Sequence, residues 1–239
     1  MLDLQNVSVS YEKDKPVIKD LSFHINKGES VGLIGANGAG KSTLMKALLG
    51  LLPATGRILV DGMAVEKANL PAIRRRLGYV LQDSDDQMFM PTVLDDMVFG
   101  PMNYGLSRAE AEEKAAAVLA RLSLSDLGGR QNHRLSGGEK RMAAIATVLA
   151  MEPDVLLMDE PTSNLDPFNR RIVINTICSL PQTRIITSHD LDMILDCCTR
   201  VILLSDGRIA ADGPAGVILR DKALLEAHRM ELPLSLSRL

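Results

Sequence analysis

Residues 30–43 read SVGLIGANGAGKST, an apolar run that leads through a glycine-rich turn to a lysine and two hydroxyl residues. The run 30–34 predicts a short strand that is buried on both faces. A helical segment, 41–51, follows the turn. Because residues 35–42 match the pattern G-x-x-x-x-G-K-[ST], the stretch predicts a phosphate-binding loop between a strand and a helix.

The spacing of this phosphate loop has a chemical reason. Glycines let several backbone N–H groups point inward around a phosphate, and the following helix adds its positive N-terminal end. Lys41 is expected to reach the β and γ phosphate oxygens, and the Ser42 hydroxyl is expected to hold Mg²⁺. The residues predicted to bind the nucleotide here are Gly35, Ala36, Asn37, Gly38, Ala39, Gly40, Lys41, Ser42 and Thr43.

A second apolar run ends in two acids. Residues 155–160 read VLLMDE, so Asp159 and Glu160 follow a predicted buried strand. Acids at the carboxyl ends of parallel strands face the ligand crevice of an open sheet. We expect Asp159 to hold Mg²⁺ through water, and Glu160 to polarise the water that attacks the γ-phosphate. The alternative is that the two acids only form a turn. The phosphate loop, with Lys41 and Ser42, favours the functional interpretation.

Short apolar strands recur along the chain and alternate with helical patterns. Further strands are expected at 2–9, 18–25, 57–60, 77–82, 184–187 and 201–204, and helices at 107–122 and after Ser136. Such alternation predicts an α/β fold with a largely parallel sheet.

Composition narrows the class of protein. The chain has 239 residues, of which 46% are apolar and 24% charged, as in ordinary globular domains. Aromatics make up 3% and the net charge is −3, so no nucleic acid partner is expected. No basic segment precedes an apolar run at the N-terminus, and the longest near-apolar stretch, 142–151, is too short for a membrane span. We therefore expect a cytoplasmic chain that reaches a membrane only through a partner.

The three cysteines, Cys178, Cys197 and Cys198, lack the spacing of metal ligands. Disulfides are rare in cytoplasmic proteins, so reduced and buried thiols are expected.

Between the two phosphate-site motifs, residues 135–139 read LSGGE, 24 residues before Asp159. At this pentapeptide the chain strongly resembles the ABC-type ATPases, because it looks like their signature motif. The other matches follow the family's order along the chain: Tyr11 (adenine-stacking aromatic), 35–42 (Walker A), Gln82 (Q-loop), 155–160 (Walker B and its glutamate), Ser163, Asn164, Leu165 and Asp166 (D-loop), and His189 (switch histidine).

Taken alone, three of these residues have structural alternatives. Tyr11 could be an edge-strand tyrosine, Gln82 a residue at a strand end, and His189 a structural histidine. The resemblance implies catalytic roles for Glu160, His189 and Gln82, and a Mg²⁺ site made by Ser42, Gln82 and Asp159.

The resemblance also implies the architecture. It is a P-loop NTPase (RecA-like) core with a mainly parallel sheet, an N-terminal antiparallel β subdomain and an inserted helical subdomain. A single domain would cover residues 1–239. Residues 1–82 and 151–239 would form the nucleotide-binding core, and residues 83–150 the helical subdomain with the signature motif.

A serine and two glycines at a helix start form a second anion site. In the resembled family this site closes over the ATP of another subunit, so hydrolysis requires a dimer with two nucleotides between the subunits. The residues implied to act in trans are Leu135, Ser136, Gly137, Gly138 and Glu139. A homodimer is favoured, because the chain carries both half-sites.

Other nucleotide-binding classes fit less well. Only 92 residues separate Ser42 from Leu135, which leaves no room for the long coiled coil of DNA-repair and chromosome-organising ATPases. Translation-type members carry two cassettes, whereas this chain has one Walker A motif. The nearest match to a GTPase guanine motif, NKGE at 26–29, precedes the phosphate loop. The energising subunit of a membrane transporter remains, with a soluble nucleotide-gated switch as an alternative.

Residues 82–101 resemble the energy-coupling factor (ECF) transporter ATPases, with D-D-Q, an aromatic, T-V and F-G-P in order. The apolar run 88–91 is expected to be exposed for a partner, with packing into the helical lobe as the alternative. The predicted coupling surface comprises Gln87, Met88, Phe89 and Met90.

The ECF resemblance implies two membrane partners, a transmembrane coupling protein and a substrate-binding membrane protein, at the cytoplasmic face of the cell membrane. Segments 149–153 and 231–236 resemble the cobalt/nickel branch. Cobalt or nickel ions are therefore the favoured cargo, and a vitamin is the second candidate.

Overall fold

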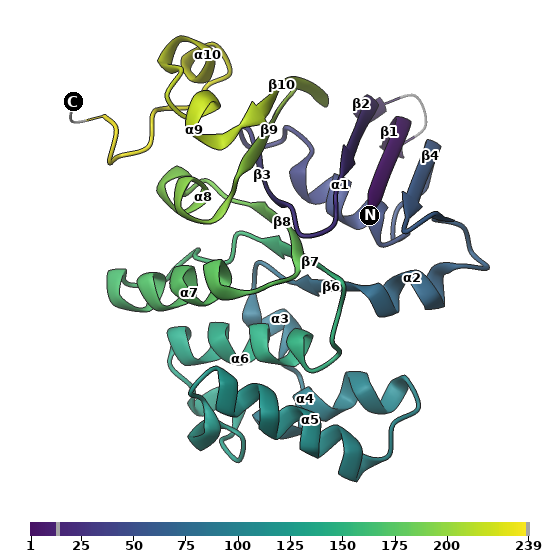
Figure 1. Ribbon diagram of the computed structural model, residues 1–239, viewed down its shortest axis with the longest axis vertical. Helices are drawn as coiled ribbons and strands as arrows, with labels where there is room; N and C mark the ends of the chain where they lie inside the picture. The colour runs from purple at the N-terminus through teal and green to yellow at the C-terminus, as the bar shows by residue number, and fades with distance from the viewer. Residues whose placement is uncertain (13–14, 238–239) are drawn as a thin grey trace.

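The computed structural model describes residues 1–12 and 15–237, which form two β-sheets with helices packed around them (Figure 1). The N-terminal sheet has the strand order β2-β1-β4-β5, with antiparallel pairing throughout. Its strands are β1 (Leu2–Glu12), β2 (Lys15–Ile25), β4 (Ala54–Val60) and β5 (Met63–Ala64). The expected N-terminal antiparallel subdomain is therefore present.

The second sheet has the order β10-β9-β3-β8-β7-β6 and is parallel except at its β10 edge. Every residue of β3 and β7 is buried, as their continuous apolar runs predict. Its strands are β3 (Ser30–Ile34), β6 (Leu77–Val80), β7 (Val155–Asp159), β8 (Thr183–Thr187), β9 (Arg200–Ser205) and β10 (Arg208–Pro214). The α/β class and the P-loop NTPase core are confirmed.

Helix α1 (Lys41–Leu48) begins directly after the phosphate loop and joins the two sheets. Its Leu44 is buried in one cluster with Leu4 of β1 and Leu33 of β3. The helix is shorter than the predicted 41–51, because Gly50 has a left-handed φ of 62° that ends the last turn.

The remaining helices of the core belong to the large parallel sheet. Residues of α7 and α8 share a second buried cluster with its strands, and both helices lie beside the sheet in Figure 1. Among the described residues, no helix has the length and apolar character needed to cross a membrane. These helices are α2 (Leu70–Arg76), α7 (Pro167–Ser179), α8 (Leu191–Cys197), α9 (Ala215–Ile218) and α10 (Lys222–Ala227).

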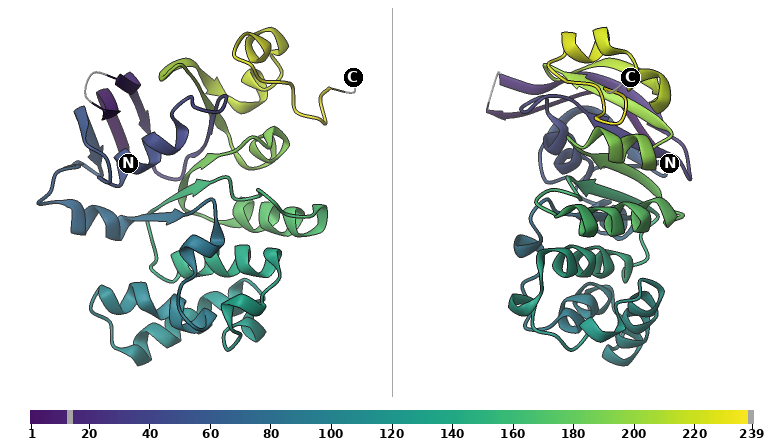
Figure 2. Two further views of the ribbon diagram at one scale, coloured as in Figure 1. Left: turned by 180° about the vertical axis from the view of Figure 1, so that it is seen from behind. Right: turned by 90° about the vertical axis from the view of Figure 1, so that its left-hand side faces the viewer.

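A helical lobe lies between β6 and β7 in the sequence, at the end of the molecule far from the N-terminal sheet (Figures 1 and 2). Residues such as Met97, Ala115 and Ala143 form its own buried cluster. Its elements are α3 (Ser84–Gln87), α4 (Val93–Asn103), α5 (Arg108–Arg121), η1 (Ser125–Leu127), η2 (Asn132–Arg134) and α6 (Gly137–Leu149). The boundaries at 83 and 150 stay a prediction.

Two helices of the lobe begin with the same device. Ser107 caps α5 and Ser136 caps α6, and each serine exchanges hydrogen bonds with a glutamate three residues later, Glu110 or Glu139. Both reciprocal pairs satisfy backbone N–H groups that the first turn leaves free. The sequence S-x-x-E therefore fixes where each helix starts.

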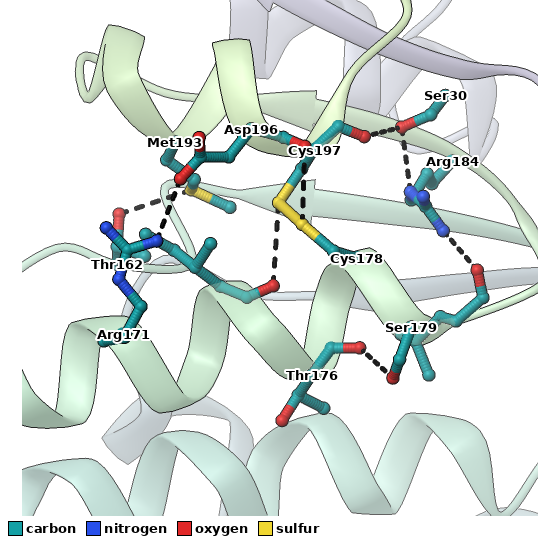
Figure 3. Close-up of a disulfide and its surroundings, with 12 residues drawn as sticks. Ser30, Thr162, Arg171, Thr176, Cys178, Ser179, Arg184, Met193, Asp196 and Cys197 are labelled. Atoms are coloured by element: carbon teal, nitrogen blue, oxygen red, sulfur yellow. Dashed lines mark hydrogen bonds and ion pairs between the residues drawn. A yellow bond between two sulfur atoms is a disulfide. The ribbon is translucent and has the colours of Figure 1, made fainter. Parts of the chain in front are cut away.

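The prediction of three reduced, buried cysteines was wrong. Cys178 is exposed near the end of α7 and forms a disulfide with Cys197 at the end of α8 (Figure 3). The packing of α7 on α8 brings their Cα atoms to 5.0 Å across 19 positions of sequence, which spacing alone does not reveal. Only Cys198 is a free, buried thiol, and burial raises its pKa to about 11.

The contact between the lobe and the core gives a test of the packing. A Cβ at Gly78 of β6 would collide with the Val148 side chain of α6 and lie 2.8 Å from Pro153 Cγ. We expect Gly78→Val to lower the free energy of unfolding by about 1–3 kcal/mol, because overpacked neighbours must shift. Urea unfolding measures the change. In the control Gly129→Ala, a Cβ meets open space, and equal losses in both variants would contradict this packing.

Candidate functional site

The phosphate loop connects β3 to α1 at the carboxyl edge of the parallel sheet. Gly35 and Gly40 have φ angles of 147° and 106°, which L side chains rarely adopt. A Cβ at Gly35 would collide with the Leu204 carbonyl oxygen, and one at Gly40 with the Ile18 side chain. The glycines of the motif are therefore required by backbone angle and by space.

The Lys41 ammonium lies inside this loop. Its Nζ donates to the carbonyl oxygens of Gly35 at 2.7 Å and Ala36 at 3.2 Å, and lies 3.5 Å from His189 Nε2. Burial lowers the pKa of Lys41, and the nearby Asp159 and Glu160 carboxylates oppose that shift. The cation is thus fixed in the loop by carbonyl oxygens and faces the two acids of the second motif.

Asp159 ends β7 and accepts hydrogen bonds from three hydroxyl groups. Thr187 of β8 donates to Oδ1 at 2.6 Å, Ser42 to the same oxygen at 3.3 Å, and Tyr79 of β6 to Oδ2 at 3.1 Å. Burial and the neighbouring carboxylate raise the pKa of Tyr79, so its phenol keeps the proton that it donates. Sequence reasoning missed Tyr79 and Thr187, because only the pairing of β6 and β8 with β7 brings them to Asp159.

Glu160 follows with a strained backbone. Its φ of 47° is unusual for a residue with a side chain. Its carboxylate oxygen Oε2 accepts from the backbone N–H of His189 at 3.1 Å and from Ser188 Oγ at 3.4 Å. The other oxygen, Oε1, is buried without a hydrogen-bond partner in the described part of the chain and lies 3.7 Å from His189 Nε2. Such a buried, unpaired acceptor is costly in a fold and is typical of a functional site.

A half-buried ion pair fixes the segment that carries His189. Asp190 accepts two hydrogen bonds from the Arg170 guanidinium of α7, at 2.5 and 2.6 Å, and one from Thr162 at 3.3 Å. The bidentate pair holds the start of α8 against α7. Sequence reasoning did not find Arg170, since nothing in the chain marks it as the partner of Asp190.

Four of the residues described above, Lys41, Asp159, Glu160 and His189, line one cavity of about 610 Å³. Tyr11 lies at its exposed end, and its hydroxyl is 3.2 Å from Thr43 Oγ1. A neighbouring cavity of about 670 Å³ shares Ser42, Gln82, Asp159 and Ser163 with the first. The first cavity is lined by Tyr11, Val17, Asn37, Gly38, Gly40, Lys41, Ser42, Thr43, Gln82, Asp159, Glu160, Ser163 and His189.

The signature residues 135–139 do not line this first cavity. Ser136 and Gly137 are exposed at the start of α6, and Ser136 Oγ accepts the backbone N–H of Glu139 at 3.3 Å. Gly138 is buried against Asn169 of α7, where a Cβ would collide with the Asn169 amide. Within one chain, the exposed Ser136 and Gly137 are therefore free to face another molecule.

The D-loop leads from Glu160 into α7. Ser163 N donates to Glu160 O at 3.1 Å, and Asp166 caps α7 by accepting from the N–H groups of Phe168 and Asn169. Asn164 has a φ of 61°, a conformation that asparagine tolerates better than most residues. The asparagine at this D-loop position is thereby explained. Leu165 borders the neighbouring cavity.

Half of the predicted coupling surface is turned inward. Gln87 donates to Ala144 O of α6 at 2.6 Å and accepts from Leu81 N at 3.0 Å. Met88 is only 6% exposed and packs in the core of the lobe, and Met90 is half-buried. Phe89 alone of the four is well exposed, at 63%. The expected exposure of the apolar run 88–91 holds for Phe89 and was wrong for Met88, because Met88 packs with Met97 and Ala143 in the lobe, as the alternative had it.

Comparison with known proteins agrees with this geometry. The profile of the ABC transporter family matches residues 18–163. An ABC transporter ATP-binding protein of Geobacter sulfurreducens is 46% identical over 99% of this chain and 95% of its own. The energy-coupling factor transporter ATP-binding protein EcfA of Methanothermobacter thermautotrophicus is 41% identical, over 98% of this chain and 77% of its own. The cobalt import ATP-binding protein CbiO of Rhodobacter capsulatus is 44% identical, over 91% and 80%.

A solved structure resembles the whole fold. The cbiO1 protein of Clostridium perfringens, described as part of the ABC transporter complex cbiONQ, superposes with a TM-score of 0.84. It is 32% identical, and the match covers 95% of this chain and 93% of that one. A profile match over more than half of the chain, together with near full-length relatives, shows that the chain belongs to the ATP-binding proteins of ABC transporters, which bind and hydrolyse ATP.

Proposed function

We propose that the chain is the ATP-hydrolysing, energising subunit of a membrane importer of the ECF type, with cobalt or nickel ions as cargo. It would work as a homodimer at the cytoplasmic face of the membrane, bound to a transmembrane coupling protein and a substrate-binding membrane protein. The observation that carries the hydrolytic part is the single cavity onto which Lys41, Asp159, Glu160 and His189 converge.

In this proposal, each residue of the cavity has a separate role in ATP hydrolysis. The phosphate loop and Lys41 bind the phosphates, and Tyr11 offers its ring to the adenine. Glu160 Oε1, buried and unpaired, is the acceptor available to a water that attacks the γ-phosphate. His189 lies between Lys41 and Glu160 and can stabilise charge that develops on the γ-phosphate. Gln82, on the wall of the same cavity, would sense that phosphate.

The donor set fits Mg²⁺. Mg²⁺ prefers hard oxygen ligands, and Asp159 and Ser42 bring a carboxylate and a hydroxyl oxygen to within 3.3 Å of each other. The side-chain oxygen of Gln82 can be added from the wall of the cavity. When bound, the ion would neutralise charge on the phosphate oxygens.

Glu160→Gln tests the role of the general base. The amide keeps the shape but cannot take up a proton, so we expect ATP hydrolysis to slow on the order of 10²-fold or more. ATP binding should persist, so a dimer should accumulate with Mg-ATP in size-exclusion chromatography. Glu113→Gln, an exposed site on α5, is the control and should keep the parent rate. Hydrolysis by Glu160→Gln near the parent rate would remove Glu160 from this role.

Ser136→Arg tests whether the signature residues act in trans. The bulky side chain would occupy the place where the γ-phosphate of the facing subunit must dock, so ATPase activity should be lost. ATP affinity of the monomer should hold, because the phosphate loop supplies it. Ser107→Arg is a matched control, since it removes the same kind of capping box from α5.

Mixed dimers complete that test. A dimer of Ser136→Arg with Lys41→Ala contains one site with an intact phosphate loop and an intact facing signature. We expect part of the ATPase activity to return on mixing. No activity in the mixture would contradict complementation at the single intact site, and full activity of isolated Ser136→Arg would remove Ser136 from the proposed role.

Names of relatives and short sequence segments support the ECF assignment and the metal cargo. EcfA and CbiO are both more than 40% identical to this chain. The D-D-Q, T-V and F-G-P segments within 82–101 point to the same type. A vitamin importer of the ECF type and another ABC transporter are the alternatives, and a soluble nucleotide-gated switch is a more distant one. The cargo specificity of a co-purified membrane complex distinguishes them.

An aromatic pair on the lobe is the proposed docking surface for the transmembrane coupling protein. Phe89 and Phe99 are exposed by 63% and 43%, and their rings meet edge to face with centroids 5.1 Å apart. Met102, on the same helix as Phe99, is also exposed. Exposed apolar groups that gather in one place are typical of a protein interface.

Phe89→Ala should weaken assembly with the proposed transmembrane coupling protein by on the order of tenfold or more, because a central aromatic anchor is lost. Co-purification from membranes measures assembly, and the midpoint of thermal unfolding should stay near that of the parent. Val217→Ala removes an equally exposed apolar side chain from α9 and is the control. Equal assembly of Phe89→Ala and the parent would place the docking surface elsewhere.

A further inference from the structure

The buried carboxylate of Asp96 binds the backbone of residues 88–91, which carry Phe89 and are called the docking segment below. Asp96 of α4 is only 6% exposed. Its Oδ1 accepts the backbone N–H groups of Phe89 at 3.2 Å and Met90 at 3.1 Å. Its Oδ2 accepts the side-chain amide of Asn132. The carboxylate therefore holds the backbone that carries the exposed Phe89 ring.

The Asn132 side chain binds the same segment. Its side chain is 8% exposed, and Nδ2 donates to Met90 O at 2.6 Å as well as to Asp96. Its Oδ1 is buried and has no hydrogen-bond partner among the described residues. All hydrogen bonds of the Asn132 side chain thus go to the docking segment and to the acid that holds it.

Asn132 lies just before the signature motif in the sequence. Asn132 begins η2, and its carbonyl oxygen accepts the N–H of Leu135, the first signature residue, at 3.3 Å. Ser136 follows directly. One short turn therefore joins the buried amide to the residues expected to engage the facing ATP.

Backbone pairing strengthens the same junction. Thr92 and Gln131 form an isolated antiparallel bridge, and Val93 N donates to Arg130 O at 3.1 Å. Asn132 N lies 3.4 Å from Pro91 O. Consequently, residues 90–93 and 130–132 form one hydrogen-bonded unit between the docking segment and the signature.

Resting on the proposed function above, we propose that Asp96 and Asn132 form a latch that couples the docking segment 88–91 to the signature motif. Both are positioning residues, and neither touches the nucleotide. Hydrogen bonds to a buried carboxylate are strong and have no water to replace them, so the two segments shift together. Coupling between two sites is reciprocal, so closure over ATP must change the surroundings of Phe89.

A second connection could carry such a signal instead. The buried Arg141 of α6 donates to Leu81 O at 2.7 Å and to Gln82 O, and Gln87 bridges Leu81 to Ala144. This route joins the Q-loop to the signature helix without Asp96 or Asn132. An experiment on the latch must therefore separate the two routes.

The chain contains no tryptophan, so Phe89→Trp supplies a single fluorescent reporter at the docking segment. In the Glu160→Gln background, Mg-ATP should produce the closed dimer, which size-exclusion chromatography detects. With the latch intact, closure should shift the tryptophan emission. We expect Asn132→Ala to reduce that shift at least about threefold while the dimer still forms, because the coupling passes through the amide. Gln131→Ala, an exposed neighbour, is the control and should leave the shift intact.

Variants that change the donor and the acceptor of the Asp96–Asn132 hydrogen bond distinguish a loss of coupling from a general loss of structure. Asp96→Asn keeps an acceptor for the N–H groups of Phe89 and Met90 but sets its amide against that of Asn132, so the shift should fall. The combined Asp96→Asn and Asn132→Asp restores one donor–acceptor pair across the latch and should recover part of the shift.

The outcomes are distinct. An undiminished shift in Asn132→Ala overturns the latch and assigns the coupling to the Arg141 route. No shift with the latch intact, although the dimer forms, overturns coupling to the docking segment altogether. Failure of Mg-ATP to produce any dimer overturns the proposed ATP sandwich itself.

Discussion

The Asp159 carboxylate is the group on which the site depends most. Hydroxyl groups of Ser42, Tyr79 and Thr187 converge on it from the phosphate loop, β6 and β8. Each comes from a different element, so the carboxylate fixes the register of two neighbouring strands and the start of α1 at once. A charged acceptor held by three donors is stable in a buried place, whereas an unpaired one is not.

The charge balance follows from this position. Asp159 and Glu160 are both buried, and Lys41 is the cation that faces them. Asp159 has its hydroxyl donors, but Glu160 keeps one oxygen unpaired and a left-handed backbone. Glu160, the residue next to the expected reaction, therefore has a strained backbone, and the surrounding strands keep it in place.

Short sequence patterns predicted the strands and helices whose formation depends mainly on neighbouring residues. Continuous apolar runs predicted buried strands such as β3, and the helices expected at 107–122 and after Ser136 are present as α5 and α6. Side-chain partners that depend on strand order, such as Tyr79 for Asp159, were not accessible from one sequence. The disulfide between α7 and α8 and the inward turn of Met88 escaped for the same reason, because helix packing decides both. The catalytic roles themselves stay predictions.

The second cavity is lined by residues of both the core and the helical lobe. Its wall joins Ser42 and Asp159 of the core to Gln82 and Arg141. Arg141 donates to the carbonyl oxygens of Leu81 and Gln82, so the Q-loop backbone is attached to α6. A movement of the lobe would therefore carry Gln82 with it, while Asp159 stays with the sheet. The distance between Gln82 and the Asp159 carboxylate is thus set by how the lobe sits on the core.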